Sequence, residues 1–431
     1  RKGLEAVESY LREMADSGVT VLRLMLEYAH REHRYFEYPQ PGRFNPAMVR
    51  LWDDLFALCE QVGIRVLLAP WDNFWMARRW KRHPYNCAMG GPCEGPHSFF
   101  TDEATFQATV RRFQYVIERW GGSGVIAAWD LFNEIHPHWG GTPQEQSAVI
   151  TRLSEAVREA ETAAWGFTRP QTVSVFGPKP EPGYEEMIFA HPSLDFATTH
   201  IYEGAIDFPT DPVTPALTMG RWVRYARERA AALLPGRTRP FTDSEHGPIH
   251  LFNDHRKFQT EAKDNRYEHN LIWAHVASGG AGSGMRWPAR NPHILTAGMR
   301  TSLRSLADFS RRVDWRHFSP RAEPTDGVTG LRLDGAAGIH LFGCRDDHQA
   351  IAYLLRSHDS ESFARNGTLT LPQVTPGSLW RVERWDTVNG VSAGCQEIRA
   401  DAGGNLQMPL NSVFAPRQRD VALVLRRQMT C

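Results

Sequence analysis

A repeated unit, an amphipathic helix followed by a glycine and an apolar strand, constrains the fold of this chain more than any other feature. Residues 1–17 carry apolar side chains at helical spacing up to Gly18, and the apolar run 19–26 follows directly. Asn45-Pro46 makes a favourable helix start for a second unit. Gly63 and the apolar run 64–69 complete this second unit. Gly121-Gly122 and the run 125–132 complete a third unit.

Four more apolar runs with helical segments between them extend the pattern. The runs are 172–176, 194–200, 240–244 and 282–287, and the helical segments are 145–164, 216–234, 265–278 and 298–311. Continuous apolar strands that alternate with helices predict a parallel sheet covered on both faces. Seven strands favour an α/β fold of the (β/α)8 TIM-barrel type over a doubly wound sheet. No glycine-rich phosphate fingerprint follows a strand, which weakens the dinucleotide-binding alternative.

An eight-stranded barrel needs a first strand before the helix at 1–17, and this strand is apparently absent from the chain. Either the sequence is a trimmed piece, or a segment from elsewhere closes the barrel. The start Arg1-Lys2-Gly3, without a methionine, leads to the expectation that a native start and any signal peptide were removed.

The pattern changes at about Asp314. Short alternating runs at 339–344, 350–355, 379–385 and 421–425 are separated by Gly, Pro, Asp and Asn, which predicts a small antiparallel β-domain resembling a sandwich. We therefore expect a barrel domain over 1–313 and a β-domain over 314–431. Packing against the barrel is favoured for the second domain over carbohydrate binding. Asn366-Gly367-Thr368 fits a glycosylation acceptor and a hairpin turn equally.

Charge and cysteine content narrow the possible partners. Basic and acidic residues number 49 each, so the sequence gives no electrostatic case for a nucleic acid or an anionic membrane. No apolar run approaches the roughly 20 residues that span a bilayer. Cys87 and Cys93 flank a loop rich in Gly and Pro and are candidates for a disulfide, which favours a secreted or periplasmic protein. Cys59 is expected to be a buried thiol. No cofactor is expected, and the oligomeric state is left open.

Polar and aromatic residues gather where the predicted strands end, which is where barrel enzymes place reacting groups. They are Arg23, Trp71-Asp72-Asn73, Asn133-Glu134, His200 with Tyr202, Glu245-His246, and Trp287. Glu134 and Glu245 are 111 residues apart. This separation equals three βα units of about 37 residues, so the two glutamates are expected on the fourth and seventh strands, facing each other across the mouth. Retaining cleavage of a glycosidic bond uses such a pair, with one carboxyl group as acid and a carboxylate roughly 5–5.5 Å away as nucleophile.

An Asn-Glu pair after strand four and a Glu after strand seven resemble clan A glycoside hydrolases. With Arg23, His200-Ile201-Tyr202 and Trp287, the barrel over about 1–310 resembles glycoside hydrolase family 5, which holds cellulases and β-mannanases. The segment Phe99-Phe100-Thr101-Asp102 resembles the mannanase branch. The chain departs from the family in two places. The family often has a His at the end of strand three, where this chain has Pro70-Trp71-Asp72-Asn73. A Pro usually follows the catalytic acid, whereas Glu134 is followed by Ile135-His136-Pro137.

The resemblance implies a role for each residue. Glu134 would be the acid/base and Glu245 the nucleophile, and Asn133 would hold the sugar 2-hydroxyl. The supporting residues would be Tyr202 as donor to Glu245, His200 beside Glu134, Arg23 beside Glu245, and Trp287 under the sugar. Structural alternatives are an ion-pair role for Arg23 and a core position for Trp287. Trp71, Asp72, Asn73 and His246 complete the expected substrate-binding set.

The connection 71–100 is long for a barrel loop and rich in aromatic residues. Loops of this length are usually functional, either as a wall that imposes exo action or as stacking subsites for endo action. The main prediction is a retaining β-glycoside hydrolase acting on a β-linked glucan- or mannan-type chain, without a metal.

Two other classes are weighed against it. One is a metal-dependent barrel hydrolase that uses His136 and His138, with His246, His250 and His255 as further candidates after the predicted seventh strand. Pro137 places His136 and His138 in a turn, and no Glu-x-x-His motif accompanies them. The other is a non-catalytic carbohydrate-binding barrel, which has no need of two glutamates.

Overall fold

The computed structural model describes residues 2–27, 35–136, 139–202, 211, 213–247, 260–287, 293–321, 330–357, 367–415 and 418–428. By its internal contacts the chain forms two compact units, Arg1–His200 and Ile201–Cys431. The division falls within one strand, β5 (Ala197–Ile201), which forms a two-stranded sheet with β6 (Phe241–His246). Each unit is described by itself below.

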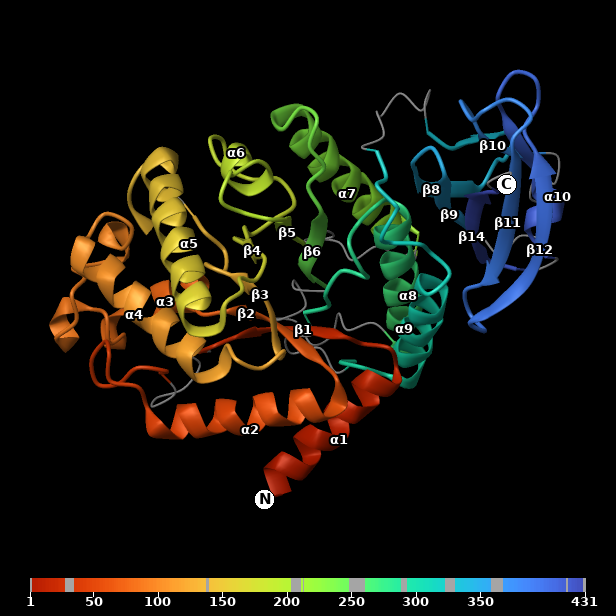
Figure 1. Cartoon of the computed structure of the whole chain (residues 1–431). Coiled ribbons are helices and arrows are strands. Elements are labelled where there is room, and N and C mark those ends of the chain that lie inside the picture. Colours follow the sequence, from red (N-terminus) through yellow and green to blue (C-terminus); the bar gives the residue numbers. More distant parts are fainter. Residues whose placement is uncertain are drawn as a thin grey trace. The chain divides into compact units, whose positions relative to one another are not determined.

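The first unit is built on a parallel sheet with strand order β1-β2-β3-β4. The strands are β1 (Val21–Met25), β2 (Arg65–Ala69), β3 (Ile126–Asp130) and β4 (Gln171–Thr172). The helices before and between them are α1 (Lys2–Asp16), α2 (Pro46–Val62), α4 (Glu103–Trp120) and α5 (Pro143–Trp165), followed by the short α6 (Glu185–Phe189) (Figure 1). Each strand follows a predicted helix, so the expected alternation is confirmed, although the run 172–176 is a strand only at Thr172.

Local signals explain where these helices begin and end. The Asn45 side chain accepts the N–H of Ala47, Pro46 occupies the first helical position of α2, and Gly63 ends the helix with a φ of 76°. Asp102 caps α4 by accepting the N–H of Thr105. These residues account for the starts of α2 and α4 and for the end of α2.

The long connection 71–100 is ordered around a buried carboxylate. It contains α3 (Asn73–Arg79) and the short 3-10 turns η1 (Trp80–Arg82), η2 (Cys87–Met89) and η3 (Pro96–Ser98). Glu27, which follows β1, pairs with Arg112 of α4 at 2.7 Å and with His83 of the connection at 3.1 Å. Trp71, His83 and Tyr85 are buried. Several aromatic residues of this connection therefore pack inside it, whereas its role as a wall or as stacking subsites stays a prediction.

The sequence left open whether Cys87 and Cys93 form a disulfide, and in the structure both are free thiols. Cys87 is exposed, whereas Cys93 is buried and its thiol donates to the Gly95 carbonyl at 3.1 Å. Cys59 is a buried thiol as predicted, and burial raises its pKa to about 11.

The second unit places three helices against an antiparallel sheet. The helices are α7 (Thr214–Leu233), α8 (Glu261–Ala277) and α9 (Ala297–Ser310). The sheet has the order β12-β11-β14-β9-β8, with β8 (Ile339–Arg345), β9 (Gln349–Arg356), β11 (Leu379–Asp386), β12 (Val391–Arg399) and β14 (Asp420–Arg427). Trp273 of α8 stacks on Tyr353 of β9 with ring centroids 5.9 Å apart, inside one apolar core shared by helices and sheet. This contact agrees with a packing role for the predicted β-domain.

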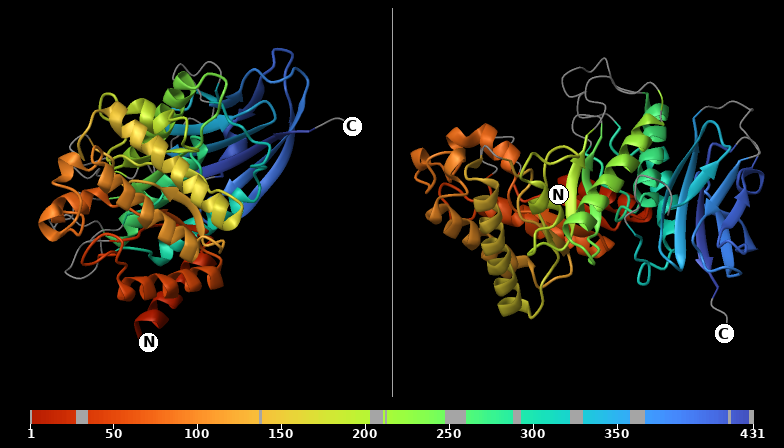
Figure 2. Two further views of the ribbon diagram at one scale, coloured as in Figure 1. Left: turned by 60° about the vertical axis from the view of Figure 1, so that its left-hand side comes forward. Right: turned by 90° about the horizontal axis from the view of Figure 1, so that it is seen from above.

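A second antiparallel sheet, β13-β10-β7, shares another core with the first sheet. Its strands are β7 (Arg332–Asp334), β10 (Thr368–Leu371) and β13 (Leu406–Pro409), and the one-turn helix α10 (Leu410–Val413) follows β13. Figure 2 shows the antiparallel strands of this part in two further orientations. Of the turn predicted at 366–368, Asn366 lies outside the described residues and Thr368 begins β10. A division of the chain at residues 313 and 314 stays a prediction.

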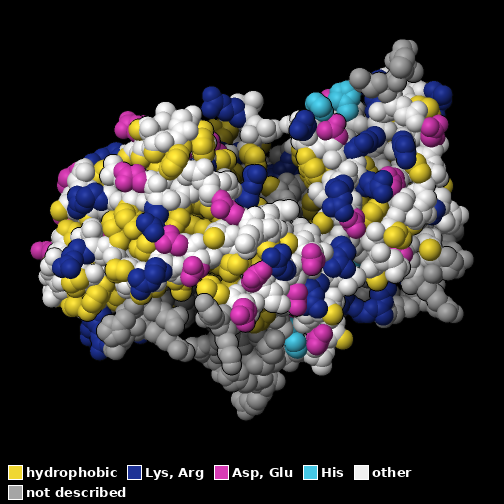
Figure 3. Space-filling model, turned by 60° about the horizontal axis from the view of Figure 1, so that its bottom comes forward, with side chains coloured by type: hydrophobic (Ala, Val, Ile, Leu, Met, Phe, Trp, Pro, Cys, Tyr) yellow, Lys and Arg dark blue, Asp and Glu magenta, His cyan; other side chains and the backbone are white. Residues whose placement is uncertain are grey.

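The surface agrees with the balanced composition. On the face shown in Figure 3, Lys and Arg side chains are interspersed with Asp and Glu. Among the described helices, none combines the length and the apolar character needed to cross a membrane.

Candidate active site

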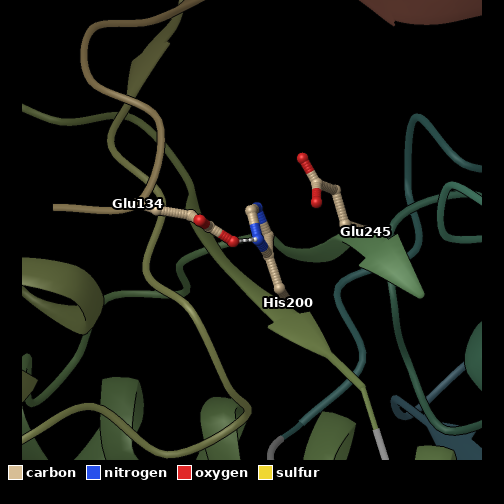
Figure 4. Close-up of side chains that lie close together, drawn as sticks. All are labelled: Glu134, His200 and Glu245. Atoms are coloured by element: carbon tan, nitrogen blue, oxygen red, sulfur yellow. Dashed lines mark hydrogen bonds and ion pairs between the residues drawn. The ribbon is translucent and has the colours of Figure 1, made fainter. Parts of the chain in front are cut away.

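Glu134 is held at the end of β3 in an unusual backbone conformation. Its φ is 53°, in the left-handed region that few residues other than glycine adopt. Its N–H donates to the Ser174 hydroxyl at 3.1 Å. Its carboxyl oxygen Oε1 lies 2.7 Å from Nδ1 of His200 on β5. Figure 4 marks this contact with a dashed line, and the expected contact between these side chains is confirmed. The Glu134 side chain is 10% exposed and therefore retains access to solvent.

This environment makes Glu134 a weak acid. Burial raises the pKa of Glu134 to about 7. The positive charge of Arg23 lowers this pKa by less than burial raises it, and the negative charge of Asp130 raises it further. A carboxyl group with this pKa is protonated in a large fraction of molecules at neutral pH. It can therefore give up a proton and take one back, as a general acid/base must.

Arg23 is a buried ion-pair residue in the first unit. Its guanidinium donates to Asp130 at 2.6 Å, to Asn133 Oδ1 at 2.6 Å and to the Ser174 hydroxyl at 3.2 Å. Its side chain is only 4% exposed. These contacts correspond to the structural alternative for Arg23. Sequence reasoning missed Asp130 and Ser174, which look like ordinary residues of their apolar runs.

Asn133 is held from both sides of its amide. Its Oδ1 accepts from Arg23, and its Nδ2 donates to Asp72 Oδ1 at 3.0 Å. Asp72 also caps α3, accepting the N–H of Trp75 at 3.4 Å. The orientation of the Asn133 amide next to Glu134 is therefore fixed by contacts with β1 and the start of α3.

Trp71 and Asn73, both predicted to bind substrate, are wholly buried. The Arg112 guanidinium lies 4.1 Å from the centroid of the Trp71 ring. A ring covered in this way presents no face to a sugar, so the structure corrects the substrate-binding role expected of Trp71 to a packing role. Asn73 begins α3, and its N–H donates to the Asn133 carbonyl.

Glu245 lies on β6 in the second unit, and its side chain is drawn in Figure 4. The Tyr202 hydroxyl donates to Glu245 Oε2 at 2.6 Å, which confirms the expected hydrogen bond. Both residues are buried, with 5% of Glu245 and 7% of Tyr202 exposed. A short hydrogen bond of this kind is directional and fixes the orientation of the Glu245 carboxylate.

His246, the next residue on β6, takes part in a buried ionic network. Nδ1 lies 2.6 Å from Asp243 Oδ2, and Nε2 lies 3.4 Å from Glu268 Oε1. Burial alone would lower the pKa of His246, but the carboxylates of Glu268 and Asp243 raise it to about 9. His246 is therefore an imidazolium with both nitrogens engaged and no exposed surface. It has no free atom for a sugar or a metal ion, which corrects its predicted role in substrate binding.

The network continues along α8 and ends beside Trp287. Arg286 donates to Glu268 at 2.8 Å and to Asp264 at 2.8 Å. In the described residues the run 282–287 forms a single parallel bridge, between Arg286 and His246, in place of the predicted strand. The Trp287 N–H donates to the His246 carbonyl at 2.7 Å, and its side chain is partly exposed. Trp287 is therefore not a fully buried core residue, and its place under the sugar stays a prediction.

The histidines of the metal alternative are only partly described. Burial lowers the pKa of His136. His138, together with His250 and His255 further along the chain, lies outside the described residues. The use of His136 and His138 as a metal site stays a prediction.

No family model matches the sequence, and no curated protein matches it either. Solved structures do match. A glycoside hydrolase family 5 structure from Bacteroides vulgatus is similar over 98% of this chain and 86% of its own, with a TM-score of 0.60 and 10% identity. A structure titled only glycoside hydrolase covers 98% of this chain and 89% of its own, with a TM-score of 0.58 and 12% identity.

An endo-1,4-β-D-mannanase from Thermotoga petrophila aligns with 70% of this chain and 95% of its own, with a TM-score of 0.52 and 17% identity. At such low identity these likenesses concern the fold. The chain therefore has the (β/α)8 barrel fold of the glycoside hydrolases, family 5 structures among them.

Proposed function

We propose that this protein is a retaining β-glycoside hydrolase that cleaves a β-linked glucan- or mannan-type chain. The observation that carries the proposal is the nearly buried Glu134 carboxyl group, which lies 2.7 Å from His200 Nδ1 and whose pKa is raised by burial to about 7. The fold likeness to glycoside hydrolases supports a carbohydrate substrate. The mannanase among the similar structures supports mannan as one of the two substrate classes to test.

In the proposed mechanism the two glutamates act in turn. Protonated Glu134 gives its proton to the leaving glycosidic oxygen while the Glu245 carboxylate attacks the anomeric carbon, which yields a glycosyl ester. Glu134, now a carboxylate, takes a proton from water, and the resulting hydroxide equivalent displaces Glu245 from the same carbon. Two inversions give overall retention.

The neighbouring side chains suit these roles. Tyr202 donates to Glu245 and so holds the carboxylate in a fixed orientation for attack. His200 fixes the orientation of the Glu134 carboxyl group. Asn133 is held next to Glu134 and would contact the sugar 2-hydroxyl, and Trp287 would stack under the ring.

A secreted or periplasmic location remains part of the proposal, because a polysaccharide substrate lies outside the cell. The free Cys87 and Cys93 no longer support it.

Product analysis over defined β-glucans and manno-oligosaccharides tests this function. The anomeric configuration of the first product should be followed by proton NMR before mutarotation. We expect hydrolysis of at least one β-glucan or β-mannan substrate with the β-anomer appearing first. An α-anomer as first product would contradict the retaining mechanism. Loss of activity after chelation, restored by a divalent metal, would instead favour the metal-dependent class.

The pH dependence should report the acid. The first step requires protonated Glu134, so kcat/KM for a natural oligosaccharide should fall about tenfold per pH unit above an apparent pKa near 7. An aryl glycoside with a good leaving group needs no protonation and serves as the control, because its kcat/KM should be much flatter over the same range. An equally steep fall for both substrates would assign the limb to another group.

A further inference from the structure

Asp243 connects two chain segments that carry proposed catalytic groups. It lies on β6 and is wholly buried. Its Oδ1 accepts the N–H of Ile201 at 3.0 Å and the N–H of Glu245 at 3.3 Å. Ile201 directly precedes Tyr202, whose hydroxyl donates to the Glu245 carboxylate. One carboxylate oxygen therefore binds the main chain at Glu245 and at the residue that directly precedes Tyr202.

The other oxygen of Asp243 is fixed by His246. Oδ2 lies 2.6 Å from Nδ1 of this imidazolium, whose Nε2 faces Glu268. Glu268 in turn accepts from Arg286 at 2.8 Å, and Arg286 also donates to Asp264 at 2.8 Å, so positive and negative side chains alternate. Charge-assisted hydrogen bonds of this kind are short and directional, and removing one partner leaves a buried charge uncompensated. Asp243 is thus held in one orientation from the side opposite Ile201 and Glu245.

The backbone of Gly284 lies close to this contact. Gly284 has a φ of 72°, and a Cβ there would lie 3.1 Å from Asp243 Oδ2 and 3.2 Å from His246 Nδ1. The segment that bears Gly284 closes over the pair, and the Met285 carbonyl accepts the His246 N–H. The 282–287 segment therefore packs directly against Asp243 and His246.

We propose that Asp243 is a positioning residue, which His246 orients so that it aligns the Tyr202–Glu245 pair for nucleophilic attack. This inference rests on the proposed function. Displacement of a reacting group by about 1 Å can lower a rate on the order of 100-fold. A purely structural role for the same contacts would change stability and leave the reactivity of Glu245 in the folded protein unaltered.

Asp243→Asn is the first test. Asparagine has nearly the same size but only one acceptor oxygen. This oxygen can accept either from the backbone N–H groups of Ile201 and Glu245 or from protonated His246, but not from both sides. The measurement is covalent inactivation by 2-fluoro-glucosyl or 2-fluoro-mannosyl fluoride, whichever labels the wild-type protein. This reaction needs the nucleophile but no proton from Glu134. We expect the inactivation rate constant to fall on the order of 100-fold, with a much smaller change in the inactivator concentration for half-saturation.

Asp420→Asn is the matched control. Asp420 is also buried in the second unit, next to His269 at 3.5 Å and hydrogen-bonded to the Thr387 hydroxyl, and it contacts none of the proposed catalytic residues among the described contacts. A comparable loss of stability with an unchanged inactivation rate is expected. Thermal unfolding of each variant separates the two effects.

If Asp243→Asn does not fold, two substitutions of His246 test whether the hydrogen bond between His246 and Asp243 is needed for the inactivation rate. The Asn side-chain nitrogen occupies roughly the place of histidine Nδ1, and the Gln nitrogen that of Nε2. His246→Asn keeps a donor for Asp243 and should retain most of the inactivation rate, whereas His246→Gln should lose most of it.

Equal rates for the two His246 variants, or a wild-type rate in folded Asp243→Asn, overturn the inference while the proposed function stands. Failure of the wild-type protein to be labelled at all, together with no hydrolysis of any β-glycan, overturns the proposed function and the inference with it.

Discussion

Replacing Glu134 by alanine is expected to lower kcat/KM on natural oligosaccharides by about 10⁴-fold, the upper range for loss of a general acid/base. The buried carboxyl group with a pKa of about 7 is the proton donor in the proposed mechanism. An aryl glycoside with a good leaving group should still form the glycosyl ester, which then accumulates because no base activates water. Sodium azide needs no base, so it should restore turnover and give a β-glycosyl azide.

Rates on both substrates with and without azide, and the identity of the azide product, provide the measurement. Glu134→Gln is the companion variant, because it keeps the shape of the side chain and removes only its acidity. Both variants should fold like the wild-type protein. If azide leaves the rate on the aryl glycoside unchanged, Glu134 is not the acid/base.

Replacing Glu245 by alanine should have the larger effect, a loss of about 10⁵-fold or more on every substrate, since removal of a nucleophile affects good and poor leaving groups alike. In this variant azide can occupy the space of the missing carboxylate and attack in its place. The product should then be an α-glycosyl azide, with configuration opposite to that from the Glu134 variant. The two azide products together assign the two roles.

Peptide mass spectrometry after 2-fluoro-glycosyl labelling of the wild-type protein provides an independent measurement. The label should be on Glu245, and the Glu245→Ala variant should take none. Glu383→Ala serves as control, because Glu383 lies on β11, away from β6 in the sequence and in its sheet. A label on any other residue would falsify the assignment of the nucleophile.

Periodicity and capping residues predict the regular elements well. Helix α2 begins at Pro46 after the Asn45 cap and ends at Gly63, and the runs at 64–69 and 125–132 contain β2 and β3. These features depend on residues close together in the sequence. The short β4 and the single bridge at Arg286 were predicted as longer strands, because an apolar run does not reveal how much of it is paired.

Contacts between distant residues could not be predicted in this way. Arg23 meets Asp130 across 107 positions of the sequence, and Asp130 is one polar residue within an apolar run. Asp243 and Glu268 likewise occupy a strand and a helix in which nothing local marks them. His246 looked like a sugar ligand because it follows Glu245, and only its carboxylate partners reveal its structural place. Neighbours in space decide the roles of such residues.

The left-handed backbone at Glu134 has a consequence for how this protein balances stability against activity. A residue with a side chain costs about 1–2 kcal/mol at such a φ, and glycine avoids most of this cost. The desolvated carboxyl group adds a further penalty at the same position whenever it ionises. A chain selected for stability alone would therefore favour glycine at residue 134. Retaining glutamate there trades thermodynamic stability for a carboxyl group in a fixed direction, a compromise expected where selection acts on turnover.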